Sequence, residues 1–265
     1  MSSHFDRLTA LESAAEPGCF SGHISEDYWV QSGPNGGYLA AIALRGAMLC
    51  IEDAERIPRS LHARFLAAPV AGPFELSTEV LRQGRSMTTL ELRMRQEGRV
   101  FLAGSACFSR PFSEVAYQDV AMPAALPLEE SEALPKQIPM NHRYDMYRAI
   151  GGEFRKSERA LTGGWIRFAD PRPLDALAAA ALWDAWPPAP FARAMEQRFR
   201  GAAPTVEVSV YFKRPLPLCD DRPGDFALLQ VESTMADQGF TEESAALFSR
   251  DGRLLMQARQ LALLI

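Results

Sequence analysis

A glycine-rich turn near the start of the chain has the composition of a site for negative charge. The sequence GPNGG, residues 33–37, follows a short strand-like run and precedes a long apolar segment, so we expect a turn that leads into a helix. The backbone N–H groups of Gly36, Gly37 and Tyr38 would lie at the helix N-terminus, where the helix dipole favours an anion. Asn35, Gly36, Gly37 and Tyr38 are therefore candidate substrate-binding residues that could polarise a carbonyl oxygen.

The glycine turn also has a purely structural interpretation, and the sequence lacks the motifs of several other chemistries. A sharp turn also needs glycine for purely structural reasons, and the spacing matches neither a dinucleotide-binding fingerprint nor a P-loop. The segment GRSMT, residues 84–88, lacks the final glycine of a nucleophile elbow, and none of the four histidines has an evident serine partner. The four cysteines lie far apart and never reach metal-ligand spacing, so we expect buried thiols and no metal.

The elements that must position this turn follow the same order in both halves of the chain. A strand-like run, an apolar helix and several strands occur twice, and short echoes such as LAAIAL against LAAAAL support an internal duplication. We expect the first helix at 39–55 and the second at 171–186, with strands at 27–31, 60–70, 73–84, 86–98, 99–109, 163–170, 205–216, 225–234, 240–249 and 253–264.

A proline-rich segment separates the two copies. Five prolines and a cluster of glutamates between residues 110 and 140 make regular structure unfavourable there. We therefore divide the chain into an N-terminal unit (1–110), a linker (111–140) and a C-terminal unit (141–265).

Composition limits the partners. The 265 residues carry 28 basic and 33 acidic side chains, and this net charge of -5 argues against a nucleic-acid partner. The most apolar stretch, residues 37–51, is interrupted by Arg45 and is too short to span a bilayer, so we expect a cytoplasmic protein without a membrane partner.

A helix that is apolar around its whole circumference must be enclosed, and a curved antiparallel sheet can enclose it. Two such units in tandem predict an α+β double hotdog. The motifs GPNGG, YFKRP (211–215), VEST (231–234) and SRDGRLLMQARQ (249–260) resemble the acyl-CoA thioesterase II family. That resemblance implies hydrolysis of a fatty acyl-CoA to free acid and CoA in lipid metabolism, with no cofactor and a homo-oligomeric state.

The resemblance also implies a catalytic set of an acid, a hydroxyl and an amide that hold the attacking water. Matched residue by residue, these functions fall on Glu207, Thr234 and Gln260, and Glu207 stands where the family has aspartate. The corresponding positions of the first half, five before Phe65 and eight after Gly98, hold Ser60 and Ala106. One working site is therefore expected, built from the glycine turn of the first half and polar residues of the second.

Two alternatives remain open. Hotdog folds also host acyl-CoA hydratases and dehydratases, which need an Asp/His pair at the helix, but no histidine occurs between His23 and His62. The second alternative is a catalytically inactive protein that binds acyl-CoA or lipid, and the replacement of aspartate by Glu207 favours it. Release of free CoA would separate hydrolysis from both.

Overall fold

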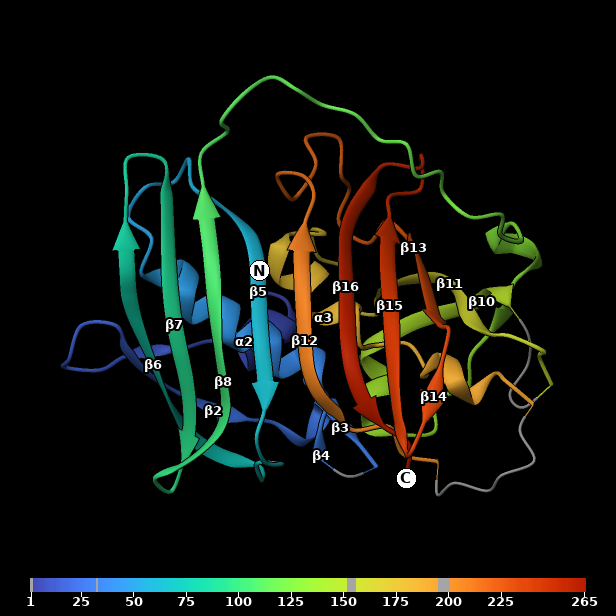
Figure 1. Cartoon of the computed structure of the whole chain (residues 1–265), viewed down its shortest axis with the longest axis horizontal. Helices are drawn as coiled ribbons and strands as arrows, with labels where there is room; N and C mark the ends of the chain where they lie inside the picture. Colours follow the sequence, from blue (N-terminus) through green and yellow to red (C-terminus); the bar gives the residue numbers. More distant parts are fainter. Residues whose placement is uncertain (1, 32, 152–155, 195–200) are drawn as a thin grey trace.

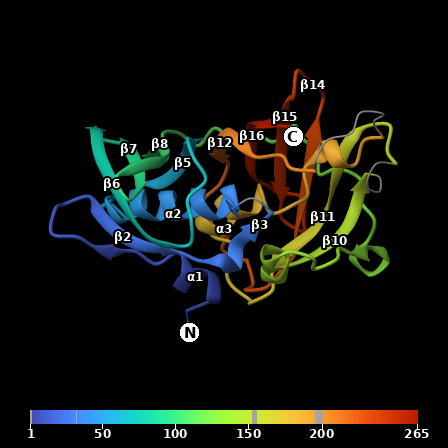
Figure 2. The same ribbon diagram turned by 90° about the horizontal axis from the view of Figure 1, so that it is seen from below.

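A computed structural model describes residues 2–31, 33–151, 156–194 and 201–265. Within these residues, fourteen strands form one antiparallel sheet in which β1-β2-β6-β7-β8-β5-β12-β16-β15-β13-β11-β10-β9 are neighbours and β14 pairs with β15. The sheet curves around the two longest helices, α2 and α3, which lie together on its inner side (Figures 1 and 2). This arrangement is a double hotdog.

Each half contributes one central helix and one part of the sheet. The first half contains α1 (His4–Leu8), β1 (Glu12–Ser13), β2 (Cys19–Ile24), β3 (Trp29–Val30), β4 (Gly33–Pro34), α2 (Gly36–Leu49), β5 (Ile57–Phe65), β6 (Gly72–Gln83), β7 (Met87–Gln96) and β8 (Arg99–Ser109). The second half contains β9 (Glu132–Ala133), β10 (Tyr144–Gly151), β11 (Ala160–Phe168), α3 (Ala176–Leu182), β12 (Thr205–Phe212), β13 (Ala227–Ser233), β14 (Ala236–Asp237), β15 (Phe240–Phe248) and β16 (Leu254–Leu263).

Several boundaries differ from the sequence-based expectation. Residues 27–31 form mainly a 3-10 turn and the two-residue strand β3, and α3 is shorter than the expected helix at 171–186. Strands β2 and β10 were not expected. The segment of β2, CFSGHI, contains a glycine and a histidine and therefore has little strand propensity, so its pairing with β6 must depend on tertiary packing.

The parts of the sheet from the two halves join where β5 pairs with β12 across the middle of the molecule. Both strands contain a β-bulge at the matching place, because Arg59 is the extra residue between Pro58 and Ser60 and Val206 is the extra residue between Thr205 and Glu207. A bulge sets which side chains face inward. The shared bulge therefore supports the internal duplication and controls the orientation of Glu207.

Close packing of α2 on α3 depends on Gly37. A Cβ atom at this position would lie 2.3 Å from the carbonyl oxygen of Ala181 in α3, which is closer than nonbonded atoms can approach. The Ala-rich sequence of α3, all of it buried, gives the matching smooth surface. The N-terminus of α2 consequently lies beside the C-terminal end of α3, and the glycine turn of one half meets residues of the other.

The predicted linker runs along the outside of the sheet (Figure 1). Residues 110–127, all of which the structure describes, form no helix or strand. The Gln118 side chain fixes this segment to the turn before β16, because its Nε2 donates to the Gly252 carbonyl at 2.9 Å and its Oε1 accepts from the Leu254 N–H at 2.9 Å. The linker is thus attached to the second half.

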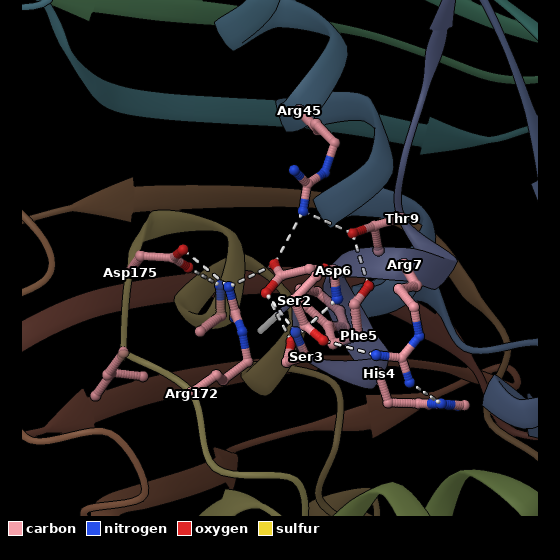
Figure 3. Close-up of polar contacts among 12 residues, drawn as sticks. Ser2, Ser3, His4, Phe5, Asp6, Arg7, Thr9, Arg45, Arg172 and Asp175 are labelled. Carbon is pink, nitrogen blue, oxygen red and sulfur yellow. Dashed lines mark hydrogen bonds and ion pairs between the residues drawn. The ribbon is translucent and has the colours of Figure 1, made fainter.

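The N-terminal helix α1 ties both central helices together through one carboxylate (Figure 3). Asp6 Oδ1 accepts from Arg45 of α2 at 3.2 Å and from Arg172 at 3.1 Å, and Arg172 also bonds Asp175, which caps α3. The Arg172 side chain is only 2% exposed and its guanidinium lies over the ring of Phe5. This cluster lies at the N-terminal end of α3, the opposite end of the helix pair from Asn35.

We expect the substitution Asp6→Asn to lower the free energy of unfolding by about 1–3 kcal/mol, because the buried Arg172 loses one of its two carboxylate partners. Burial opposes ionisation of Asp6, but the Ser3 hydroxyl, Arg172 and Arg45 outweigh it and lower its pKa. This contribution is therefore complete above the unfolded-state pKa of about 3.9 and disappears as the pH falls through the lower folded-state pKa.

Thermal unfolding of Asp6→Asn and wild type, followed between neutral pH and pH 3, measures this effect. The difference in melting temperature between the two proteins should become smaller only in the acidic range. Glu12→Gln on the exposed strand β1 serves as the control and should unfold like wild type. A difference in melting temperature that is the same at every pH, or no difference at all, would contradict the role of Asp6.

Candidate functional site

The glycine turn folds as expected, but its amide groups are already bonded. Asn35 is the N-cap of α2, and its Oδ1 accepts from the Tyr38 N–H at 3.0 Å. The Gly37 N–H donates to Asp184 Oδ2 at 3.1 Å, and Asn35 Nδ2 donates to the same oxygen at 2.8 Å. The expectation of a free Tyr38 N–H is therefore wrong. The Gly37 N–H, which could polarise a substrate oxygen, already donates to the carboxylate of Asp184 from the other half.

Asp184 lies two residues beyond the end of α3, after the C-cap Trp183, and is a partly exposed residue. Burial of the carboxyl group raises its pKa to about 7, although hydrogen bonds from Gly37, Gly36 and Asn35 act in the opposite direction. Gly36 is partly exposed as well, and a Cβ there would lie 3.0 Å from Asp184 Oδ2. The missing side chain at Gly36 thus leaves room for the carboxylate.

A second buried acid, Glu243, lies on β15 and is 2% exposed. Its Oε2 accepts from the Ala189 N–H at 2.7 Å and its Oε1 accepts from Gln260 Nε2 at 3.1 Å. Burial and the negative charge of Asp184 together raise the pKa of Glu243 to about 7, against the lowering effect of its hydrogen bonds from Ala189 and Gln260. This carboxyl can gain and lose a proton near neutral pH.

Gln260 links this acid to a hydroxyl. Its Oε1 accepts from Thr205 Oγ1 at 2.6 Å, so Thr205, Gln260 and Glu243 form a continuous chain of side-chain hydrogen bonds. Gln260 and Glu243 are directly opposite each other on β16 and β15, whereas Thr205 comes from β12. Thr205 is partly exposed, and the other two are buried. An acid, an amide and a hydroxyl therefore meet on the inner face of the second half.

The structure does not bring Glu207 to this site. Glu207 lies on β12 with half of its side chain exposed, and its Oε2 accepts from Arg64 Nε at 3.3 Å across the strand pair. The bulge at Val206 explains the orientation, because it removes the alternation that would otherwise place residues 205 and 207 on the same face. Thr205 faces inward and Glu207 outward.

Thr234 also lies away from Gln260. It follows the end of β13, is exposed, and its Oγ1 donates to Glu242 Oε1 at 2.9 Å. The neighbouring Ser233 is the buried hydroxyl of the VEST motif and is within hydrogen-bonding distance of the Thr241 hydroxyl, at 2.9 Å. Of the three residues assigned by resemblance, only Gln260 belongs to the inner cluster.

The first half has no equivalent of this cluster at the matching positions. Leu90 is directly opposite Ala106 there, as Glu243 is opposite Gln260 in the second half. Both residues are buried and apolar. The polar groups at these positions thus occur in the second half alone, in keeping with the single site that the comparison of Gln260 with Ala106 predicts.

The sequence contains a signal for Glu243 that the motif comparison missed. Along β15, Thr241, Glu243, Ala245 and Leu247 are buried at alternate positions, so a carboxylate shares the face of the apolar residues. A glutamate in such a register must be paired or have a raised pKa. No comparable pattern identifies Thr205, because its inward orientation depends on the bulge.

Other features of the described residues lie apart from this cluster. A cavity of about 710 Å³ is lined by Leu49 and Cys50 at the far end of α2 and by residues of β2, β6 and β7. Since α2 has 14 residues, this cavity is roughly 20 Å from the glycine turn. Among the described residues, no group of three His, Cys, Asp or Glu side chains is placed to hold a metal ion, and no helix is long and apolar enough to cross a membrane.

Two family models match the chain in succession. The acyl-CoA thioesterase N-terminal domain matches residues 25–109, and the acyl-CoA thioesterase C-terminal domain matches residues 120–264. The chain, a double hotdog with a buried acid and amide and an adjoining hydroxyl, therefore belongs to the acyl-CoA thioesterase family. Among the curated proteins, none matches it significantly.

Solved structures share the fold over almost the whole length. A hot dog fold protein of unknown function from Alicyclobacillus acidocaldarius is 28% identical, with a TM-score of 0.88, and the match covers 98% of this chain and 97% of that one. A thioesterase II from Thermobifida fusca is 24% identical, with a TM-score of 0.83 and coverage of 99% and 98%. An acyl-CoA thioesterase II from Mycobacterium marinum is 22% identical, with a TM-score of 0.79 and coverage of 98% for both chains.

Proposed function

We propose that this protein hydrolyses the thioester bond of a fatty acyl-CoA, with Glu243 as the general base. The observation that carries the proposal is the buried Glu243 carboxyl, held by the Ala189 N–H and connected through Gln260 to Thr205. These are the three kinds of functional group that the family resemblance assigns to water activation. Two of them come from different residues than the motif comparison gave.

The reaction follows from the properties of these groups. An ionised Glu243 takes a proton from a water molecule, and the resulting hydroxide attacks the thioester carbon. Gln260 and Thr205 have further hydrogen-bonding capacity with which to orient that water. The tetrahedral intermediate then breaks its carbon–sulfur bond, and the proton held by Glu243 passes to the leaving CoA sulfur, so that the free acid and CoA are released. Amide groups at the N-terminus of α2 are suited to stabilise the negative oxygen that forms on the way.

A panel of acyl-CoA substrates of different chain length tests the proposal. We expect stoichiometric release of free CoA, detected with a thiol-reactive dye, for at least one chain length. If acyl-CoA raises the melting temperature but no chain length yields CoA, the protein is an acyl-CoA-binding protein and hydrolysis is wrong. Conversion of an enoyl-CoA to a hydroxyacyl-CoA without CoA release would instead indicate a hydratase.

Three further predictions accompany this function. We propose a role in lipid metabolism, a cytoplasmic location and a homo-oligomeric state, dimer or larger. A single chain already contains both hotdog units, and the candidate site is assembled from β12, β15, β16 and the α2 turn of that one chain. Light scattering of the purified protein measures the oligomeric state independently of activity.

A further inference from the structure

The carboxylate of Asp184 is hydrogen bonded to N–H groups at the N-terminus of α2 that could otherwise polarise an acyl-CoA carbonyl oxygen. Asp184 Oδ2 accepts from Gly37 N–H at 3.1 Å and from Asn35 Nδ2 at 2.8 Å, and the Asn35 amide also donates to the Asp184 carbonyl at 2.8 Å. Asp184 belongs to the second half, and these donors belong to the first. A substrate oxygen and the carboxylate therefore compete for the same N–H groups.

We propose that Asp184 is a positioning residue that closes the α2 amide site in the free enzyme and is exchanged for the thioester oxygen when substrate binds. The inference deepens the proposed function, since it concerns the same acyl-CoA at the same site. A neutral carbonyl oxygen is a weaker acceptor than a carboxylate. The exchange becomes favourable when Asp184 takes up a proton, because the neutral acid releases the amide groups more readily.

The surroundings of Asp184 favour this proton uptake. The titratable groups near it are Glu243 from β15 and Tyr144 from β10, and no lysine or arginine is among the groups that set the pKa of either acid in the described residues. A negative charge on Asp184 raises the pKa of Glu243, so a proton on Asp184 favours the ionised form of Glu243. With one proton on the pair, Glu243 can act as the base while Asp184 is neutral.

The absence of a side chain at Gly36 allows the Asp184 carboxylate to lie against the α2 amide groups. Gly36 lacks a side chain where a Cβ would lie 3.0 Å from Asp184 Oδ2 and 3.3 Å from the Phe65 ring. Gly36, Phe65 and Asp184 are all partly exposed, unlike the buried Asn35 and Glu243. The part of the site next to Gly36 thus lies nearer to solvent than the part next to Glu243.

Binding of two unreactive CoA analogues at different pH tests the inference without turnover. The first analogue is a ketone in which a methylene group replaces the thioester sulfur, so it keeps the carbonyl oxygen. The second is an S-alkyl-CoA, which has no carbonyl. Above the pKa of Asp184, we expect the Kd of the ketone to rise about tenfold per pH unit, whereas the Kd of the S-alkyl-CoA should lack this dependence.

The variant Asp184→Asn should bind the ketone with a Kd that is independent of pH, since it has no proton to take up. Asp237→Asn on the exposed strand β14 is the matched control and should behave like wild type. Equal pH dependence for both analogues in wild type, or an unchanged dependence in Asp184→Asn, would overturn the inference. The comparison of analogues in wild type needs no variant, so it decides the question even if Asp184→Asn folds poorly.

These outcomes are separable from failure of the proposed function. If no acyl-CoA is hydrolysed but ketone binding is coupled to proton uptake through Asp184, the exchange holds and hydrolysis does not. If wild type hydrolyses acyl-CoA and Asp184→Asn loses activity together with the acidic limb of the pH profile, Asp184 is the base rather than a positioning residue, and the inference is wrong.

Discussion

Replacing Glu243 with glutamine should reduce kcat for acyl-CoA hydrolysis by about 10²–10⁴-fold, the usual contribution of a general base. Glutamine has nearly the same shape and can still accept a hydrogen bond from the Ala189 N–H, but it cannot take a proton from water. The KM should change little, because the substitution removes an interaction made in the transition state. Steady-state kinetics with the best substrate of the panel measures both constants.

The pH dependence gives an independent check on the same residue. Glu243 must be ionised to act, and its pKa lies at about 7, so kcat of wild type should fall as the pH decreases below neutrality. The residual activity of Glu243→Gln should lack this acidic limb. Its melting temperature should remain close to that of wild type, which separates a chemical effect from unfolding. A variant with wild-type kcat would exclude Glu243 as the base.

The second large effect concerns stability. Gly37→Ala should lower the free energy of unfolding by about 3 kcal/mol, because its Cβ would lie 2.3 Å from the Ala181 carbonyl oxygen and the two helices would have to separate. At roughly 2–4 °C per kcal/mol for a domain of this size, the melting temperature should fall by about 6–12 °C. Differential scanning calorimetry measures this change directly.

Gly36→Ala is the matched control for this substitution. Its added Cβ meets the side chains of Asp184 and Phe65, both of which can shift, rather than a backbone atom. We therefore expect a clearly smaller loss of stability. Equal melting temperatures for Gly37→Ala and wild type would show that the close approach of α2 and α3 is not required.

The double hotdog could be inferred from local sequence because its main determinants are local. The apolar residues around the whole of α2 require enclosure, and the alternation in β6, β7 and β8 predicts a meander. The repeated order of elements then gives two units. Strands β2 and β10 could not be predicted in this way, since they depend on pairing with β6 and β11.

The candidate site was only partly predictable for a related reason. Gln260 and the glycine turn each lie in a short continuous motif that can be recognised in the sequence. The orientation of Glu207, by contrast, depends on one extra residue in β12, and no local pattern reveals a bulge. The bond between Gly37 and Asp184 spans 147 residues, so it arises only from the packing of the two halves. Contacts of this kind need the three-dimensional structure.

A side-by-side comparison of kcat for Glu243→Gln and Glu207→Gln tests most directly whether Glu243 is the general base. The two substitutions make the same chemical change, one at the buried acid beside Gln260 and one at the exposed acid paired with Arg64. We expect kcat of Glu207→Gln to stay within about threefold of wild type and kcat of Glu243→Gln to fall about 10²-fold or more. The opposite order, with activity lost at Glu207 and kept at Glu243, would contradict this expectation.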